Sequence, residues 1–215
     1  MNVLFVGNSY TLYNDVPGQV AALAAADGQA ITTDRVARGG ADLKAHATET
    51  GALERAADPA YTHVVLQEKS TGTLHDADDY HRYVRRLGER VRGQVLLYET
   101  WARQTGHAVY RWGWSGRSPV VMRRHVRREL EKAATDLDAE VVGVGTAWER
   151  ALERYPDLIL HDTDGHHASP AGSHLAACTF YAHLSKRDVT QVDWHPDDVA
   201  PELSARLKAV AAAVT

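Results

Sequence analysis

Short runs of β-branched residues alternate along the chain with longer segments of helical periodicity. This alternation is typical of βαβ units, in which helices connect the strands of a parallel sheet. Runs rich in β-branched and other apolar residues predict strands at residues 2–6, 31–37, 62–67, 94–98 and 140–144. Helical patterns predict helices at residues 17–26, 43–57, 78–91, 119–138, 147–155, 169–184 and 201–213. The sequence therefore predicts an α/β fold, a flavodoxin-like three-layer α/β/α sandwich on a parallel sheet of about five strands.

Length and composition narrow the class of protein further. The 215 residues contain no repeat, linker or shift in composition, so we expect a single domain over residues 1–215. A net charge of −4 gives no broad basic field for nucleic acid or an anionic membrane, so neither partner is expected. Cys178 is the single cysteine and excludes an internal disulfide. With no signal peptide and no long apolar run, the expected location is the cytoplasm.

The loop after the first predicted strand, residues 7–11, carries the first chemical signal. Ser9 or Thr11 in it could cap the next helix, but Asn14 and Asp15 lie nearer to the predicted helix start. In parallel α/β sheets, ligands bind beyond the carboxyl ends of the strands. Ser9 is therefore free to project its hydroxyl into that crevice.

A second signal lies near the end of the chain. Ser169 and Pro170 form a good helix start, which leaves Asp164 and His167 in the preceding loop. At this spacing a carboxylate can reach Nδ1 of the imidazole and leave Nε2 free to take a proton from a serine. Ser9, His167 and Asp164 thus supply a nucleophile, a base and its orienting partner.

Other interpretations of these segments are a histidine-rich surface turn, a metal site and an anion-binding loop. A metal site would draw on a crowded set of side chains: His161, Asp162, Asp164, His166, His167 and His174. Neither a cysteine pair nor an H-E-x-x-H spacing supports it, so no metal or other cofactor is expected. The alternative is a flavodoxin-like module whose residues 7–11 cradle a phosphate or nucleotide. The chain lacks the usual glycine patterns for this, and the Asp164–His167 pair would have no role.

Taken together, these blocks resemble the SGNH, or GDSL-type, hydrolase superfamily over nearly the whole chain. The blocks are Gly7-Asn8-Ser9, a glycine after the second strand, and Asp164-x-x-His167. The similarity is closest to a poorly characterised subfamily with two further blocks, here Leu66-Gln67-Glu68 and Thr100-Trp101-Ala102-Arg103. The resemblance implies that Ser9 is the nucleophile, His167 the base and Asp164 its partner. It further implies that backbone N–H groups of Ser9 and Gly40 contribute to an oxyanion hole.

One block departs from the superfamily pattern. Where the superfamily has Gly-x-Asn-Asp, with the asparagine donating to the oxyanion, this chain has Gln67-Glu68-Lys69-Ser70. Gln67 carries the same amide donor on a longer arm and is assigned that role, with Ser70 as the alternative. Glu68 and Lys69 are interpreted as a solvated pair at the rim.

The segment at residues 101–119 is long for a connection and is predicted to be a lid or binding loop. Trp101, Trp112, Trp114 and Arg103 are the candidate substrate-binding residues, although Trp101 could instead fill the core. Arg103 and Arg111 could meet a substrate carboxylate or phosphate. The arginines of the following helix are interpreted as a solvent face: Arg123, Arg124, Arg127 and Arg128.

The sequence thus predicts a serine esterase, or an acyl-transferring enzyme, that acts on a small acyl ester such as an O-acetyl group. An anion- or nucleotide-binding module is the alternative, and a metal-dependent hydrolase is third. The identity of the substrate, the choice between hydrolysis and transfer, and the oligomeric state stay open, because fold analogy does not rank them.

Overall fold

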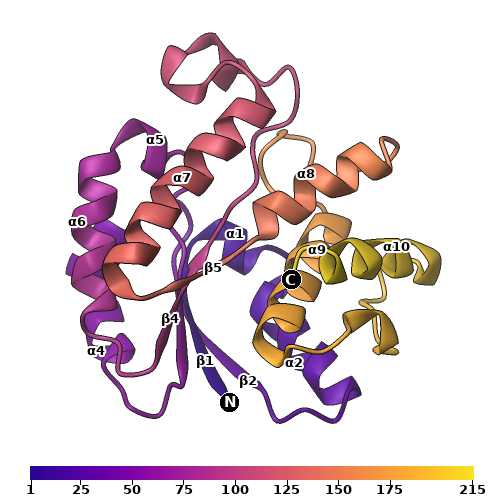
Figure 1. The fold of residues 1–215 in the computed structure, drawn as a ribbon, viewed down its shortest axis with the longest axis horizontal. Helices are drawn as coiled ribbons and strands as arrows, with labels where there is room; N and C mark the ends of the chain where they lie inside the picture. Colours follow the sequence, from indigo (N-terminus) through magenta and orange to yellow (C-terminus); the bar gives the residue numbers. More distant parts are fainter.

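The computed structural model describes all residues 1–215 and is built on one parallel sheet (Figure 1). Its strands are β1 (Asn2–Gly7), β2 (Thr32–Ala37), β3 (His63–Leu66), β4 (Gln94–Tyr98) and β5 (Glu140–Val142). They lie in the order β2-β1-β3-β4-β5, and every pairing is parallel. This is the flavodoxin-like order, so the predicted fold class is confirmed.

The α-helices are α1 (Ser9–Leu12), α2 (Val16–Ala26), α3 (Leu43–Thr48), α4 (Ala52–Ala56), α5 (Gly72–His75), α6 (Ala77–Gly88), α7 (Pro119–Leu137), α8 (Val144–Arg154), α9 (Pro170–Ser185) and α10 (Pro201–Ala212). Single 3₁₀ turns are η1 (Tyr13–Asp15), η2 (Ala108–Arg111), η3 (Gly113–Ser115) and η4 (Val189–Gln191). The predicted helix over 43–57 is divided into two, because Gly51 adopts a φ of 74° before α4. None of the helices combines the length and apolar character that a membrane span requires.

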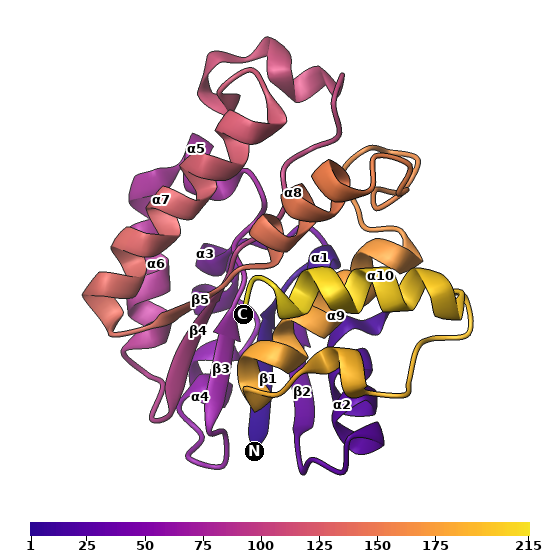
Figure 2. The same cartoon turned by 45° about the vertical axis from the view of Figure 1, so that its right-hand side comes forward.

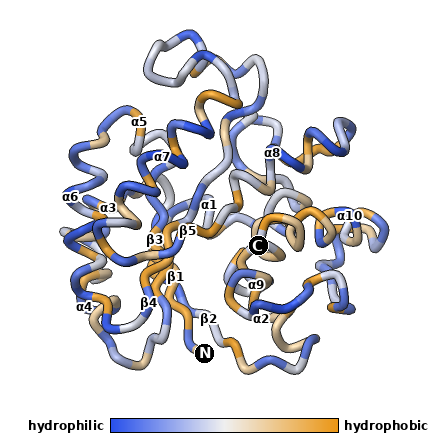
Figure 3. Tube along the Cα trace, viewed as in Figure 1, coloured by the Kyte–Doolittle hydropathy of each residue, from blue (hydrophilic) through white to orange (hydrophobic).

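The helices cover both faces of the sheet because side chains along each strand alternate in direction. Val3 and Phe5 of β1 pack with α2, α8, α9 and α10 on one side. Leu4 and Val6 pack with α3, α4, α6 and α7 on the other. The two views in Figures 1 and 2 show these layers, and Figure 3 shows that β1, β3 and β4 are largely hydrophobic, whereas α6 and α7 carry many hydrophilic residues.

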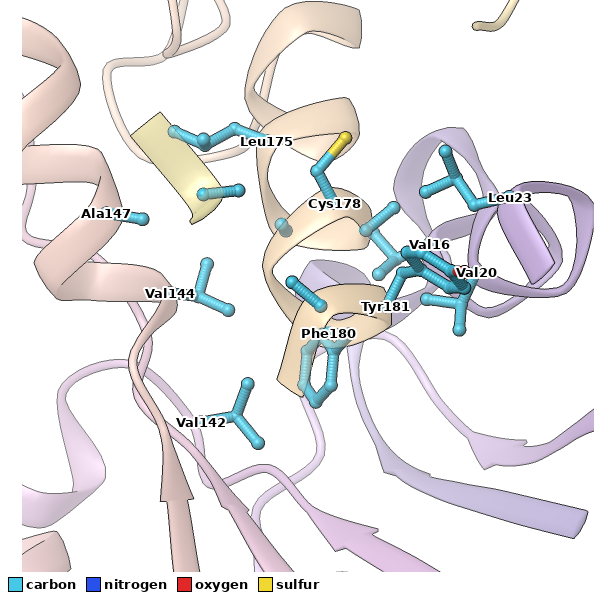
Figure 4. Packing of buried hydrophobic residues seen from close by; sticks show 14 of the residues in the cluster. Val16, Val20, Leu23, Val142, Val144, Ala147, Leu175, Cys178, Phe180 and Tyr181 are labelled. Carbon is cyan, nitrogen blue, oxygen red and sulfur yellow. The ribbon is translucent and has the colours of Figure 1, made fainter. Parts of the chain in front are cut away.

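The α9 helix is the centre of the first core. Phe180 packs edge-on against Phe5 and Tyr98, with ring centroids 5.1 and 4.7 Å apart. On its other sides α9 meets α2, α8 and α10, so it is buried almost all round. Cys178 and Tyr181 extend this packing toward α2 (Figure 4). A buried α9 is consequential because its first residue directly follows the loop that holds Asp164 and His167.

The sequence places Asn14 or Asp15 to cap the helix predicted at residues 17–26, and the structure corrects this prediction. Asn14 and Asp15 both adopt left-handed conformations, with φ of 53° and 50°, and neither side chain caps the helix. Short polar residues tolerate this region better than others do. The Asn14 amide instead donates to Ser173 Oγ at 2.9 Å, and Asp15 forms an ion pair with Arg35. The chain between β1 and α2 is thereby tied to α9.

A buried carboxylate joins the end of β4 to two helices. Glu99 is fully buried and accepts hydrogen bonds from the N–H of Thr146 at 3.2 Å and its hydroxyl at 2.9 Å. Arg123 and Arg127 of α7 approach the same carboxylate at 3.4 and 3.5 Å. The prediction of an arginine solvent face is therefore wrong for these two arginines.

For Arg124 and Arg128 that prediction is right, because both are exposed. The buried charge of Glu99, by contrast, is stable only while its hydrogen-bonding and charged partners are present.

We expect Glu99→Ala to lower the free energy of unfolding by about 3–5 kcal/mol, because it removes the partner of two arginines and of Thr146. Urea denaturation measures this. Glu131→Ala is the matched control: Glu131 pairs with Arg127 in solvent, and its loss should cost less than about 1 kcal/mol. Equal effects of the two substitutions would contradict this account of Glu99.

Candidate active site

Ser9 is placed by the abrupt change from strand to helix at the carboxyl end of β1 (Figure 2). Asn8 caps α1 by accepting a hydrogen bond from the Tyr10 N–H at 3.2 Å, and Ser9 is the first residue of the helix. A residue at this position has no intrahelical acceptor for its N–H. No other acceptor lies within reach of the Ser9 N–H, so it is free beside the hydroxyl.

The amide of Gln67 holds this loop in place. Its Oε1 accepts from the Asn8 N–H at 2.9 Å and from the Thr11 hydroxyl at 3.0 Å. Its Nε2 donates to Asn8 Oδ1 at 3.0 Å and to the Glu68 carbonyl at 2.7 Å. Gln67 is fully buried and both of its N–H donors are used. This bonding contradicts the prediction that Gln67 donates to an oxyanion; it positions the loop instead.

Gly7 allows this close approach. A Cβ at Gly7 would lie 2.5 Å from Gln67 Oε1 and 2.5 Å from Thr11 Oγ1, so no larger residue fits. On the other side, Nε2 of the buried His46 donates to the Gly7 carbonyl at 2.7 Å. Burial lowers the pKa of His46, which keeps this ring neutral. The residues before Ser9 are thus fixed from both sides.

The loop before α9 brings His167 to Ser9. Ser169 caps α9, as the sequence predicts, by accepting from the Gly172 N–H at 3.2 Å. His167 Nε2 lies 2.8 Å from Ser9 Oγ, although 158 positions separate the two residues. Its Nδ1 lies 2.6 Å from Asp164 Oδ2. The structure therefore brings the three predicted catalytic side chains into one hydrogen-bonded chain.

Asp164 is held in its charged form. Partial burial raises the pKa of its carboxyl. Hydrogen bonds from the N–H groups of His166 and His167 and from the His167 ring together lower this pKa by more than burial raises it. The two N–H groups both lie 2.9 Å from Oδ1. The net pKa of Asp164 is well below its usual range. Its carboxylate therefore favours a proton on Nδ1 of His167, which leaves Nε2 to face Ser9.

His166 is a neutral neighbour of this chain. Burial and the positive charge of Arg103 lower its pKa to about 4. Ligand atoms of Asp164, His166 and His167 lie within 4.8 Å of one another and are the set that could hold a metal ion. Both ring nitrogens of His167 are already engaged, by Ser9 and Asp164, which leaves His166 as the one free imidazole. A metal ion would find one free imidazole, that of His166, and a carboxylate that already bonds to His167, which is a poor ligand set.

The other members of the predicted metal set lie apart from this cluster. His161 donates its Nε2–H to the Ala102 carbonyl at 2.9 Å. His174 lies in the core, where its ring nitrogens contact Gln19 at 3.1 Å and Ser204 at 2.9 Å. Asp162 is exposed, and its carboxylate accepts from the Thr163 N–H.

The turn after β2 approaches Asn8. The Asn8 side-chain amide donates to the Ala41 carbonyl at 2.8 Å, which fixes the neighbouring Gly40. Gly40 has a φ of 72°, a conformation that favours glycine, and its N–H has no acceptor within the protein. Ser70 is 2% exposed, and its buried hydroxyl lies beside that of Tyr10 without a well-aligned hydrogen bond. The Gly40 N–H is therefore a free donor at the position that the resemblance indicated.

Trp101 does not contact the crevice. Its side chain is 1% exposed and stacks on Trp148 with centroids 4.1 Å apart and planes 7° apart. Its Nε1 donates to the His166 carbonyl at 3.0 Å, so it supports the loop that carries His167. The prediction that Trp101 binds substrate is wrong, and the alternative of a core residue is right.

The rest of the 101–119 segment extends beyond the carboxyl ends of the strands, at the top of Figure 1. Its first part lies along the loop before α9, where the Gln104 N–H donates to the Gly165 carbonyl at 2.9 Å. Its tip contacts α5, with Trp114 edge-on to His75 at 5.4 Å. Trp112 is 63% exposed, and Arg111 is exposed as well.

Glu68 is not at a solvated rim, as the sequence suggested. It is 7% exposed and accepts from the Leu43 N–H at 3.1 Å and the Lys69 N–H at 2.8 Å. Burial raises the pKa of Glu68 to about 7. Lys69 is exposed and its ammonium group lies 3.9 Å from Asp42 instead.

A flavodoxin-like sheet with serine, histidine and aspartate side chains joined at its carboxyl edge defines a class of α/β/α hydrolases, and comparison with solved structures identifies the family. A protein from Slackia heliotrinireducens that is assigned to the SGNH hydrolases is 32% identical, with a TM-score of 0.71. The match covers 86% of this chain and 98% of that one. The chain belongs to the SGNH hydrolase superfamily, as the sequence blocks indicated.

Two further structures share the fold. A DUF4886 family protein from Bacteroides uniformis has a TM-score of 0.85 at 20% identity, over 100% of this chain and 94% of that one. The esterase EstA from Pseudoalteromonas, in a structure inhibited by monoethylphosphonate, has a TM-score of 0.61 at 15% identity. That match covers 86% of this chain and 97% of EstA. No family model matches the sequence, and no curated protein matches it.

Glu68 generates a prediction about stability and pH. Its folded pKa of about 7 lies above the value of 4.5 for an exposed glutamate, so protonated Glu68 favours the folded state. That contribution is complete below about pH 4.5 and is lost as the pH rises through about 7. Between pH 5 and 8 the free energy of unfolding of the parent protein should fall by about 1–3 kcal/mol relative to Glu68→Gln. Parallel pH profiles of the two proteins in urea denaturation would contradict the assignment.

Proposed function

We propose that the protein is a serine esterase that hydrolyses, or transfers, a small acyl group such as acetyl. The observation that carries this proposal is the hydrogen-bonded chain from Ser9 Oγ through His167 to Asp164, with distances of 2.8 and 2.6 Å. A serine hydroxyl is a weak nucleophile until a base accepts its proton, and a base is effective when a third group orients it.

The reaction begins with His167. Its Nε2 takes the proton of Ser9, whose Oγ attacks the carbonyl carbon of the ester and forms a tetrahedral intermediate. The free N–H groups of Ser9 and Gly40 donate to the developing oxyanion, and Ser70, whose hydroxyl has no well-aligned hydrogen bond, is the candidate for a third donor. The imidazolium then protonates the leaving alcohol. Water, or an acceptor alcohol, releases the acyl group by the same steps in reverse.

The surroundings of His167 favour this proton transfer. The ionised Asp164 stabilises the imidazolium that forms, and the neutral His166 adds no repulsion to it. Tyr13 stacks on the His167 ring, with centroids 4.3 Å apart, and limits its rotation. We assign residues 101–119 the role of a lid over this site, with the exposed Trp112 at its tip.

The anion-binding alternative is less well supported by the same loop. In a phosphate cradle, the backbone N–H groups and hydroxyls of residues 7–11 would face the anion. Here the N–H of Asn8 and the hydroxyl of Thr11 both donate to Gln67. Of these groups, the Ser9 N–H is the one available to an anion. One donor suits a single oxyanion better than a phosphate group.

The nucleophile is tested by a fluorophosphonate, which forms a stable adduct with an activated serine. We expect the parent protein to gain one adduct by whole-protein mass spectrometry and Ser9→Ala to gain none, because His167 activates this hydroxyl. Peptide mapping should place the adduct on Ser9. An unlabelled parent, or equal labelling of both proteins, would count against the mechanism.

The orienting role of Asp164 is tested by Asp164→Asn. We expect kcat on 4-nitrophenyl acetate to fall about 10⁴-fold, because an amide favours the wrong tautomer of His167. Asp162→Asn, two residues away and exposed, is the matched control and should keep kcat within about threefold. Thermal melts of both variants check folding. A folded Asp164→Asn protein with kcat close to that of the control would remove Asp164 from the reaction.

A further inference from the structure

A cavity of about 510 Å³ lies apart from the proposed catalytic residues, none of which lines it. It lies between the start of α7, the α8 helix, residues 102–105 and residues 156–161. Most of its apolar wall comes from Pro119, Val120, Leu152, Leu158, Ile159 and Leu160. Ile159 is 78% exposed and Val120 is 40% exposed, so the cavity has an apolar rim that is open to solvent.

Two buried donors among the residues that line this cavity have no partner. They are Nε of Arg103 and Nε1 of Trp148, whose side chain is 2% exposed. Buried N–H groups without an acceptor are costly, and native proteins seldom retain them without a reason. An apolar cavity with a few unpaired donors is the usual composition of a site for a small amphipathic ligand.

Arg103 also carries an uncompensated charge. No carboxylate lies within 4.0 Å of it, whereas Arg123, the other arginine at the cavity, pairs with Glu99 and Glu149. One terminal nitrogen of Arg103, Nη1, donates to the hydroxyl of Tyr10. The edge of the guanidinium that includes Nε is therefore free of protein ligands, and this edge matches a planar carboxylate.

Arg103 further connects the cavity to the proposed catalytic residues. Tyr10, which it contacts, directly follows Ser9, and the Tyr10 ring lies 5.7 Å from the His167 ring. Arg103 therefore lines the cavity and also contacts the residue that follows Ser9 in the chain.

We propose that this cavity binds an apolar arm of the substrate that carries a carboxylate, with the carboxylate on Arg103 and the arm on the apolar wall. The substrate class is then an ester with a free carboxylate, and this inference rests on the proposed function. A carboxylate is preferred to a phosphate because Glu149 and Glu153 also line the cavity and would repel a dianion more strongly.

Binding is tested first, on the inactive Ser9→Ala protein, so that catalysis plays no part. Isothermal titration with hexanoate, hexanol and hexyl phosphate compares three ligands with the same chain. We expect hexanoate to bind at least about tenfold more tightly than hexanol, and Arg103→Gln to remove most of this preference. Equal binding of hexanoate and hexanol, or a preference that survives Arg103→Gln, would overturn the proposal. Tighter binding of hexyl phosphate would overturn the choice of carboxylate.

The location is tested by a matched pair at the exposed rim. Ile159→Glu and Ile159→Gln differ by one charge, and neither removes a buried side chain. In the Ser9→Ala background, Ile159→Glu should bind hexanoate more weakly than Ile159→Gln does. The two variants should bind hexanol with equal affinity. If the two variants bind hexanoate equally, the ligand occupies another place.

Activity connects the cavity to the substrate. The parent protein should have a higher kcat/KM for mono-4-nitrophenyl glutarate than for 4-nitrophenyl butyrate, and Arg103→Gln should lower this ratio about ten- to a hundredfold. Turnover of neither ester, with hexanoate binding intact, would overturn the proposed function but not carboxylate binding in the cavity. Turnover of both without a preference would separate the cavity from the substrate and overturn the inference.

Discussion

The position of Ser9 depends on one buried amide, that of Gln67. It bridges the carboxyl ends of the neighbouring strands β1 and β3, and its hydrogen bonds are all made within the protein, to Asn8, Thr11 and the Glu68 carbonyl. Because Asn8 is held at both its N–H and its side chain, the chain turns at once into α1 and presents Ser9 at the sheet edge. His167 reaches that point because a buried α9 fixes the loop before it. The proposed chemistry thus depends on two rigid supports from opposite ends of the chain.

Much of the fold could be predicted because buried parallel strands are apolar on both sides and are separated by amphipathic helices. The predicted bounds of β4, for example, agree with the structure. Four-residue helices such as α1 and α5 could not be predicted, since one turn carries no periodicity. Val144 was expected in β5 but lies in α8, because an isolated valine fits a strand and a buried helix equally well.

The pairing of Asp164 with His167 is local and could be predicted from a three-residue spacing and the helix start behind it. The roles of Gln67, Trp101 and Glu68 could not. Each follows or ends a buried strand, where the side chain faces either the crevice or the interior. Which of the two occurs depends on partners from distant segments, such as Asn8 for Gln67, and sequence order alone does not reveal them.

The contact between His167 and Ser9 is tested most directly by the tautomer of His167 in solution. In protein labelled with ¹⁵N-histidine, NMR distinguishes a protonated Nδ1 from a protonated Nε2. The account predicts that neutral His167 carries its proton on Nδ1, toward Asp164, whereas His46 carries it on Nε2, toward the Gly7 carbonyl. His167 protonated on Nε2 at neutral pH would have no lone pair for the serine proton, and would contradict the account.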